Sequence, residues 1–260
     1  MLNVKAQLVD KVKLKSDIFK FTISSKEVVE VALPGQFLNV KCSNQLEPFL
    51  RRPISISNID KNNQTLDFIF QIKGKGTKTL AEKEVGDFID IVGPLGNGTF
   101  SIKNYKNVAI IGGGIGIFPL YELAKQLKVK SNITTYLGFR NKDMVIMEDD
   151  FNKVSNTLNI STDDGSYAQK GFSVKFLKED VEKNDFDIIF ACGPMGMLKE
   201  VKKIAQEKNI PCQISLEEKM ACGIGACLGC AVKLKEEVCQ NTYGHICKTG
   251  PVFWASDVEM

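Results

Sequence analysis

The middle of the chain takes its fold from the stretch Val108-Ala109-Ile110-Ile111-Gly112-Gly113-Gly114-Ile115-Gly116. Its four apolar residues predict a short buried strand, and the four Gly that follow within five residues predict a tight turn. Helical spacing comes next, in Leu120, Leu123, Ala124 and Leu127. A strand, a Gly-rich turn and a helix in this order present a helix N-terminus, which favours binding of a nucleotide pyrophosphate.

The same turn departs from the usual dinucleotide fingerprint at two points. Ile117 stands where that pattern has its last Gly, and Arg140, rather than an acidic residue, follows the next predicted strand. A tight turn that binds nothing is therefore the alternative. Four Gly in so short a turn favour nucleotide binding at Gly112, Gly113, Gly114 and Gly116.

Further periodic segments surround this stretch. Apolar runs predict strands at 133–137, 187–191 and 212–216, and helical spacing predicts a helix over 195–208. Strands that alternate with helices are typical of a parallel sheet. We therefore expect an α/β domain with a parallel sheet over residues 104–216.

The first hundred residues show a different pattern, with short apolar runs, punctuation by Gly and Pro, and no helical spacing. The runs lie at 18–23, 36–42, 53–57, 66–72 and 88–92. They predict a small antiparallel β barrel over residues 1–103. Two adjacent basic residues on a strand edge, Arg51 and Arg52, are candidates to grip a pyrophosphate. Exposed arginines on a barrel rim are an equally good interpretation.

The overall composition excludes several classes of protein. Lys and Arg number 34 against 31 Asp and Glu, a near balance that gives no reason to expect nucleic acid or an anionic membrane as partner. The one His, His245, argues against zinc sites built on several imidazoles and against most Ser-His-Asp triads. No signal peptide or spanning segment is recognisable, so we expect a cytoplasmic protein whose Cys residues are thiols or ligands.

Five of the eight Cys follow residue 217, where core-forming periodicity ends. Cys222, Cys227 and Cys230 have the spacing C-x4-C-x2-C, which plant-type [2Fe–2S] sites combine with a distant fourth Cys. The fourth ligand is either Cys239 or Cys247. Cys247 is favoured because a Gly-Pro turn follows it and provides a returning loop.

The residues between these Cys support a cluster. Gly223, Gly225 and Gly229 allow the close approach and positive φ angles that wrapping a cluster requires. A zinc knot is the first alternative, although such knots usually have a C-x2-C pair at each end. A catalytic thiol activated by His245 is the second.

These motifs together resemble a known superfamily. The barrel with 52–55 (Arg-Pro-Ile-Ser), the Gly turn at 112–116 and 192–194 (Cys-Gly-Pro) resemble the ferredoxin–NAD(P)H reductase superfamily. The tail segments 220–230 and 247–253 narrow the resemblance to the electron-transfer subunits of class 1B (NAD-dependent) dihydroorotate dehydrogenase. The resemblance covers essentially the whole chain, and its tail motif is the most specific part.

The resemblance implies three cofactor sites. FAD would bind the barrel, NAD the α/β domain, and a [2Fe–2S] cluster the segment 217–260. The residues implied for FAD are Arg52, Pro53, Ile54, Ser55, Ile69, Phe70, Gln71, Gly76 and Thr77. Those implied for NAD are Gly112, Gly113, Gly114, Gly116, Cys192, Gly193 and Pro194. The implied cluster ligands are Cys222, Cys227, Cys230 and Cys247.

The resemblance also implies an electron relay in pyrimidine (UMP) biosynthesis. Dihydroorotate would be oxidised at an FMN in a separate catalytic subunit, within an expected two-plus-two heterotetramer. Electrons would pass through the cluster to FAD and leave as hydride to NAD+. Such a relay needs placement and tuning of cofactors, so no single side chain would be the catalyst.

Two alternatives stay open at this point. The first is the FAD/[2Fe–2S] small subunit of a sulfide dehydrogenase or of an NADH-dependent ferredoxin:NADP+ oxidoreductase. In that pattern an acidic residue replaces one Cys ligand, and Cys222 argues against it. The second is a non-enzymatic metal-binding module with a structural Gly turn. The preference for NAD over NADP is also open, because Arg140 is suited to meet a 2′-phosphate.

Several residues have no fixed role. Gln71 stands where relatives often carry Arg, and Thr249 where an acidic residue is common. His245 either tunes a cluster ligand or faces solvent. The apolar residues between the Cys ligands either shield the cluster and contact the partner or pack on their own barrel. The segment 163–166 and Glu217 also fit the family pattern without an assigned role.

Overall fold

The computed structural model describes residues 1–43, 45–235 and 242–260. These residues form two units. The first unit contains Met1–Thr99, Glu217–Val232 and Tyr243–Pro251. The second contains Phe100–Leu216, the described part of 233–242, and Val252–Met260. The chain after residue 217 therefore contributes to both units, and the four candidate cluster ligands lie in the first.

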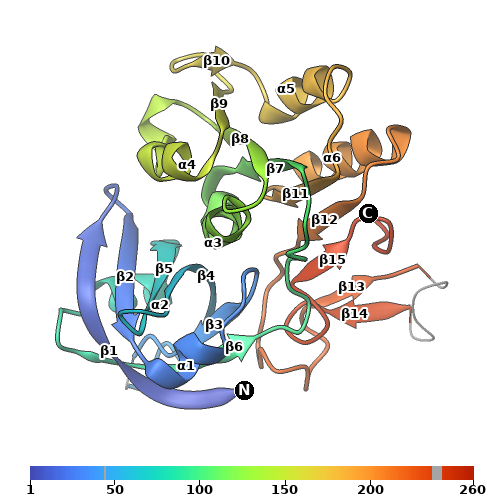
Figure 1. The fold of residues 1–260 in the computed structure, drawn as a ribbon. Coiled ribbons are helices and arrows are strands. Elements are labelled where there is room, and N and C mark those ends of the chain that lie inside the picture. Colours follow the sequence, from blue (N-terminus) through green and yellow to red (C-terminus); the bar gives the residue numbers. More distant parts are fainter. Residues whose placement is uncertain (44, 236–241) are drawn as a thin grey trace. The chain divides into compact units, whose positions relative to one another are not determined.

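A closed barrel of antiparallel strands forms most of the first unit (Figure 1), as predicted. In pairing order its strands are β1 (Leu2–Lys13), β2 (Ile18–Ser24), β5 (Thr65–Gln71), β4 (Arg52–Asp60), β3 (Phe37–Val40) and β6 (Phe88–Leu95). Two short helices, α1 (Lys26–Val31) and α2 (Lys75–Ala81), connect them. Because the barrel is closed, no strand edge with unpaired backbone N–H and C=O groups is left exposed.

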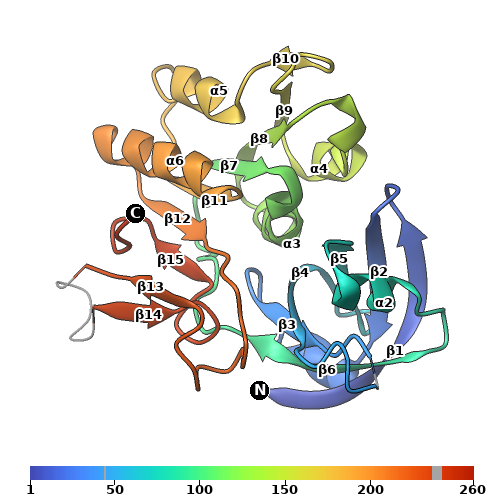
Figure 2. The same ribbon diagram turned by 180° about the vertical axis from the view of Figure 1, so that it is seen from behind.

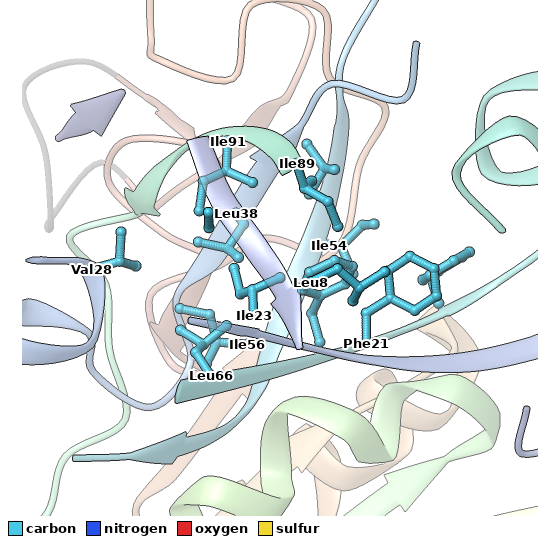
Figure 3. Packing of buried hydrophobic residues seen from close by; sticks show 14 of the residues in the cluster. Leu8, Phe21, Ile23, Val28, Leu38, Ile54, Ile56, Leu66, Ile89 and Ile91 are labelled. Atoms are coloured by element: carbon cyan, nitrogen blue, oxygen red, sulfur yellow. The ribbon is translucent and has the colours of Figure 1, made fainter. Parts of the chain in front are cut away.

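Apolar side chains from alternate strand positions fill the barrel. Figure 3 shows Leu8, Phe21 and Leu66 reaching from three strands into one cluster, and all three are fully buried. The rings of Phe68 and Phe70 pack against Phe21, with centroids 5.7 and 5.0 Å away. Burial of each such side chain contributes about 1.5–3 kcal/mol. The alternation seen in the sequence at 66–72 is therefore the period of a strand with one face in the core.

The barrel differs from the sequence prediction in its helices and its first strand. Helices α1 and α2 have 6 and 7 residues, too short for helical spacing to be recognised. Strand β1 is 12 residues long; its apolar residues Leu2, Val4, Ala6 and Leu8 alternate with polar ones, and this alternation was missed in the sequence. The prediction of no helix in this region was therefore wrong.

A seven-stranded sheet forms the centre of the second unit (Figure 2). In pairing order its strands are β10 (Gln169–Lys170), β9 (Thr157–Thr162), β8 (Asn132–Phe139), β7 (Asn107–Gly113), β11 (Ile188–Cys192), β12 (Cys212–Ser215) and β15 (Val252–Trp254). All neighbours are parallel except β15, which runs antiparallel to β12. The predicted parallel sheet is confirmed, and the segment after 217, predicted only as a cofactor segment, also contributes this edge strand.

Helices cover both faces of this sheet. They are η1 (Gly114–Ile117), α3 (Phe118–Leu127), η2 (Lys142–Met144), α4 (Glu148–Val154), α5 (Ser173–Asp180) and α6 (Met195–Glu207). Helix α3 packs with α4, and α5 packs with α6. The strand order reverses between β7 and β11, and in open α/β sheets ligands bind at the carboxyl ends of the strands at such a point.

A two-stranded sheet of β13 (Ala231–Lys233) and β14 (Tyr243–His245) completes the secondary structure of the described residues. None of the helices in the described part of the chain has both the length and the apolar character needed to cross a membrane.

Candidate functional site

The four candidate cluster ligands are arranged as two pairs of thiols. The thiols of Cys222 and Cys227 form a hydrogen bond, and those of Cys230 and Cys247 form another. Cys222 and Cys247 also interact electrostatically, which links the pairs. Within the three described ranges, no three His, Cys, Asp or Glu side chains converge on one point as ligands of a single metal ion. Two linked pairs of thiols are the ligand set that two irons require.

Backbone amides in the loop point at these sulfurs. The N–H groups of Ile224 and Cys227 donate to Cys222 Sγ at 3.5 and 3.4 Å. The N–H of Gly225 donates to Cys247 Sγ at 3.0 Å. Hydrogen bonds to the sulfurs are one means by which a protein sets the potential of an iron–sulfur cluster.

These contacts give the thiols different acidities. Burial opposes ionisation of Cys222, but backbone N–H donors and the Cys227 thiol outweigh it and lower the pKa of Cys222 to about 6. Burial and the neighbouring Cys230 thiol raise the pKa of Cys247 to about 12. The loop therefore stabilises a thiolate, the form that binds metal, at Cys222 first.

We expect this difference to appear in thiol alkylation once a chelator has removed bound metal. At pH 7.5 Cys222 is mostly thiolate and Cys247 is not, so iodoacetamide should modify Cys222 first. Lowering the pH through about 6 protonates Cys222 and should remove its advantage. Mass mapping of peptides would measure both rates, with Cys212 as a protected control, because burial raises its pKa to about 12. Equal rates for Cys222 and Cys247 would contradict the assignment.

Two of the three loop glycines have the predicted conformation. Gly223 and Gly225 adopt φ of 69° and 81°, where other residues are strained. A Cβ on Gly225 would lie 2.7 Å from Lys248 Cδ, so the loop also packs closely against the segment that carries Cys247. Gly229 is not among the positive-φ residues, and a Cβ there would make an ordinary 3.5 Å contact with Cys227 Sγ. The prediction was therefore wrong for Gly229.

Cys247 lies in a turn that closes around one carbonyl oxygen. The oxygen of His245 accepts hydrogen bonds from the N–H groups of Lys248, Thr249 and Gly250 at 3.0, 2.8 and 3.2 Å. The Thr249 hydroxyl donates to the same oxygen at 2.8 Å and accepts from the His245 N–H at 2.8 Å. Thr249, which stands where an acidic residue is common, thus closes the turn with its hydroxyl.

The same turn is fixed to the end of strand β6. The N–H of Asn97 donates to the Lys248 oxygen at 2.9 Å. Gly96 adopts φ of 89°, and a Cβ there would lie 2.5 Å from Pro251 Cδ. His245, expected to tune a ligand or to face solvent, has a buried Nε2 with no hydrogen-bond partner among the described residues. The prediction for Cys239 lies outside the described residues.

Two segments implied for FAD meet on the barrel. A Cβ on Gly76, near the start of α2, would lie 2.9 Å from Nε of Arg52 at the start of β4. The Arg52 guanidinium also donates to the backbone oxygen of Leu50 at 2.7 Å. Thr77 Oγ1 accepts from the N–H of Gly74 at 3.3 Å and donates to its oxygen at 3.2 Å, which fixes the helix start. The fold thus brings Arg52 beside Gly76, the residue that precedes Thr77.

Arg51 and Arg52, the two adjacent arginines considered for a pyrophosphate, differ in their contacts. Arg51 Nη2 forms an ion pair with Asp90 Oδ1 at 2.7 Å. Its Nη1 donates to the backbone oxygens of Asp90 at 3.0 Å and Asn39 at 3.4 Å. Arg51 therefore braces strands β3 and β6, and Arg52 alone of the pair lies beside Gly76.

The other residues implied for FAD lie on two barrel strands. Pro53, Ile54 and Ser55 pair along β4 with strand β3. Ile69, Phe70 and Gln71 end strand β5; Ile69 and Phe70 are buried, and the Phe70 ring packs in the barrel core. Gln71 Nε2 donates to Asp17 Oδ2 at 2.7 Å, so its side chain is engaged within the barrel.

The Gly turn and the segment 192–194 meet at the carboxyl ends of β7 and β11. A Cβ on Gly113 would lie 2.8 Å from Pro194 Cδ, and one on Gly116 would lie 2.7 Å from Gly193 Cα. Cys192 is buried at the end of β11, in register with Gly112 of β7. The structure therefore places all the residues implied for NAD at the point where the strand order reverses.

Packing explains most of the Gly in this turn. A Cβ on Gly112 would lie 2.8 Å from Ile117 Cγ2, and the two glycines above are equally confined. Gly114 differs: it adopts φ of 55°, and a Cβ there would meet nothing within 4 Å. Contacts within the protein therefore account for Gly112, Gly113 and Gly116, and Gly114 alone has no such packing reason.

Two further loops meet at the same edge of the sheet. The N–H of Asp164, after β9, donates to the oxygen of Arg140, after β8, at 3.4 Å. The N–H of Lys142 donates to Ser166 Oγ at 2.8 Å, and Ser166 Oγ donates to Asp164 Oδ1 at 2.7 Å. The segment 163–166, to which the sequence assigned no role, thus hydrogen-bonds the loop that carries Arg140.

Three family models match successive parts of the chain. They are an oxidoreductase FAD-binding domain over residues 5–100, an oxidoreductase NAD-binding domain over 110–203, and the iron–sulfur cluster binding domain of dihydroorotate dehydrogenase B over 217–259. The predicted cofactors FAD, NAD and an iron–sulfur cluster are thereby confirmed.

Solved structures agree with this division. A structure described in work on flavin-based electron bifurcation, an NADH-dependent reduced ferredoxin-NADP oxidoreductase, matches with a TM-score of 0.85 and 35% identity, over 98% of this chain and 90% of that chain. The cytochrome b5 reductase domain of Ulva prolifera nitrate reductase matches with a TM-score of 0.64 and 18% identity, over 80% of this chain and 94% of that one. The second likeness concerns the fold alone.

Two curated relatives match over nearly their full length. A protein of Caldanaerobacter subterraneus subsp. tengcongensis is 39% identical over 255 residues, 98% of each chain. A protein of Fusobacterium nucleatum subsp. nucleatum is 42% identical over 257 residues, 96% of each chain. Both are named dihydroorotate dehydrogenase B (NAD(+)), electron transfer subunit. The chain described here therefore belongs to the family of dihydroorotate dehydrogenase B (NAD(+)) electron transfer subunits and is an oxidoreductase component.

Proposed function

We propose that this chain carries electrons from a dihydroorotate-oxidising partner to NAD+ in pyrimidine (UMP) biosynthesis. The proposed partner is a catalytic subunit that holds FMN, in a two-plus-two heterotetramer. Electrons would pass singly through a [2Fe–2S] cluster, be collected as pairs on FAD and leave as hydride to NAD+. Similarity over nearly the full length to relatives named as electron transfer subunits supports this proposal.

Cys222, Cys227, Cys230 and Cys247 are the proposed ligands of the cluster. The observation that carries this assignment is the arrangement of the four thiols as two hydrogen-bonded pairs. Amide donors at Ile224, Gly225 and Cys227 would stabilise the negative charge on the ligating sulfurs. These residues hold and tune the group, and none of them has to move a proton.

The barrel, residues 1–103, is the proposed FAD-binding part. Arg52 is placed to donate charge-assisted hydrogen bonds to the pyrophosphate, and Gly76 keeps the adjacent helix start free of a side chain. The remaining proposed contacts are Pro53, Ile54, Ser55, Ile69, Phe70, Gln71 and Thr77.

Residues 104–216 are the proposed NAD-binding part, and 217–260 the cluster-binding segment. The nicotinamide nucleotide would lie over the carboxyl ends of β7 and β11. The proposed contacts there are Gly112, Gly113, Gly114, Gly116, Cys192, Gly193 and Pro194. Gly114 is the best candidate for direct backbone contact, because it alone of these four turn glycines has open space where a Cβ would be.

One solved structure favours a second candidate function. The ferredoxin-NADP oxidoreductase that matches at 35% identity indicates a chain that exchanges electrons with ferredoxin instead of a dihydroorotate-oxidising subunit. Cys222 argues against this candidate, because its sulfur pairs with Cys227 and accepts two amide hydrogen bonds, as a ligand position would. The FAD- and NAD-binding domain models weigh against a non-enzymatic metal-binding module.

Reconstitution with a partner decides between the two candidates. The full chain is co-purified with an FMN-containing dihydroorotate-oxidising subunit and given dihydroorotate with NAD+ or NADP+ under anaerobic conditions. We expect NADH formation, followed at 340 nm, that requires both subunits. Failure of the two to associate, together with NADP+ reduction driven by reduced ferredoxin, would favour the second candidate.

A further inference from the structure

The geometry points to Asn39 as a positioning residue that couples the FAD-binding strand to the first cluster ligand. This inference rests on the proposed function, because it takes strand β4 as part of the FAD site and Cys222 as a cluster ligand. Asn39 belongs to no motif in the sequence, and only the barrel brings it beside Cys222.

Asn39 occupies the middle of the short strand β3 and is only 3% exposed. Its backbone is in register with Pro53, in the proposed FAD segment of β4, on one side and with Val92 of β6 on the other. Its side-chain Nδ2 donates to the backbone oxygen of Cys222 at 3.3 Å. One residue thus belongs to the strand pair of the flavin site and also contacts the cysteine loop.

Gly223, the residue after Cys222, leaves the space that the Asn39 side chain occupies. A Cβ on Gly223 would lie 2.4 Å from Asn39 Nδ2 and 3.1 Å from its Cγ. The amide therefore packs directly on the backbone of the loop, at a residue whose φ of 69° already favours Gly. A buried polar group is costly to leave without a partner, so this bond is expected to persist in the folded chain.

Arg51 extends the connection toward the flavin site. Its Nη1 donates to the backbone oxygen of Asn39 at 3.4 Å, and its Nη2 is held by Asp90 at 2.7 Å. The next residue, Arg52, is the proposed pyrophosphate contact. Arg52, Arg51, Asn39 and Cys222 therefore form a continuous series of covalent and hydrogen-bonded neighbours within one unit.

Such a series couples the two cofactors. FAD that orders the start of β4 also restrains Asn39 and, through it, the backbone that carries Cys222. By linkage, the bound cluster must raise the affinity for FAD by the same factor by which bound FAD raises the affinity for the cluster. The coupling belongs to the isolated chain and needs neither the catalytic partner nor dihydroorotate.

Cluster loss from the isolated, cofactor-loaded chain tests this inference. Chelator-driven bleaching of the cluster is timed with FAD bound and again after FAD has been removed, in the wild type, Asn39→Leu and Asn39→Asp. Both substitutions keep approximately the size of the side chain and remove the N–H donor. Asn58→Leu is the matched control, since Asn58 lies on β4 and bonds Asp67 of β5 at 3.1 Å.

We expect removal of FAD to speed cluster loss in the wild type and in Asn58→Leu by about five- to tenfold. In Asn39→Leu, cluster loss should already be fast with FAD bound, and removal of FAD should add less than about twofold. The electron paramagnetic resonance g values of the reduced cluster should also shift in both Asn39 variants. A role confined to folding stability would leave these g values unchanged.

Equal acceleration by FAD removal in the wild type and both Asn39 variants would overturn the inference, as would unchanged g values. If Asn39→Leu does not fold, Asn39→Asp gives the same comparison. The proposed function fails separately: a chain that binds no FAD or no cluster would contradict it, whereas a chain that holds both without coupling contradicts only the role of Asn39.

Discussion

Replacing Cys247 by Ser should abolish the visible absorption of the cluster and slow NADH-driven reduction of one-electron acceptors that depend on it by about 100-fold or more. Cys247 Sγ accepts the Gly225 N–H at 3.0 Å and pairs with the Cys230 thiol, so its loss leaves one pair incomplete. Mutations of groups that merely support metal ligands cost about 10–100-fold, and removal of a ligand should cost more.

Cys239→Ser is the matched control for this substitution. It removes a thiol from the same segment, and we expect unchanged absorption, iron content and activity. Both variants should keep FAD, which shows that the barrel is folded. Bleaching in Cys239→Ser with an intact spectrum in Cys247→Ser would contradict the ligand assignment.

Replacing Arg52 by Ala should weaken FAD binding by about 10- to 100-fold, because charge-assisted hydrogen bonds to a pyrophosphate contribute about 1.5–3 kcal/mol. The guanidinium lies beside Gly76 at the start of α2, where the proposed phosphate contacts meet. Fluorescence titration of the flavin-free chain with FAD would measure the dissociation constant.

Arg51→Ala separates binding from stability. Arg51 pairs with Asp90 and with the backbone of β3, so its loss should lower the melting temperature and should weaken FAD binding less than the loss of Arg52 does. The opposite ranking, with Arg51→Ala as the poorer FAD binder, would show that Arg51 contributes the pyrophosphate contact after all.

Most of the fold follows from segments that are periodic and long, although the alternation at 2–8 in β1 was missed. The alternation at 66–72 predicts a strand with one face in the barrel core, and Phe68 lies there. The apolar run from Val108 and the helical spacing after it predict β7 and α3. Segments without a period were missed, among them α1 and α2 in the barrel and the edge strand β15, which is only 3 residues long.

The candidate cluster ligands could be singled out in the sequence because a loop that wraps a cluster restricts the spacing of its cysteines. The partners of these cysteines were not, since they come from distant strands. Asn39 contacts Cys222 across 183 positions of sequence, and no local pattern marks such a pair. Arg51 and Arg52 likewise look equivalent in the sequence, and only the position of Asp90 on β6 separates their contacts.

Anaerobic titration of the isolated chain with NADH tests the proposed relay most directly. We expect bleaching of both flavin and cluster, with two electrons taken up by FAD and one by the cluster, and the resonance signal of a reduced [2Fe–2S] cluster. Bleaching of the flavin while the cluster stays oxidised, under conditions in which dithionite reduces it, would contradict a path from the nicotinamide site through FAD to the cysteines.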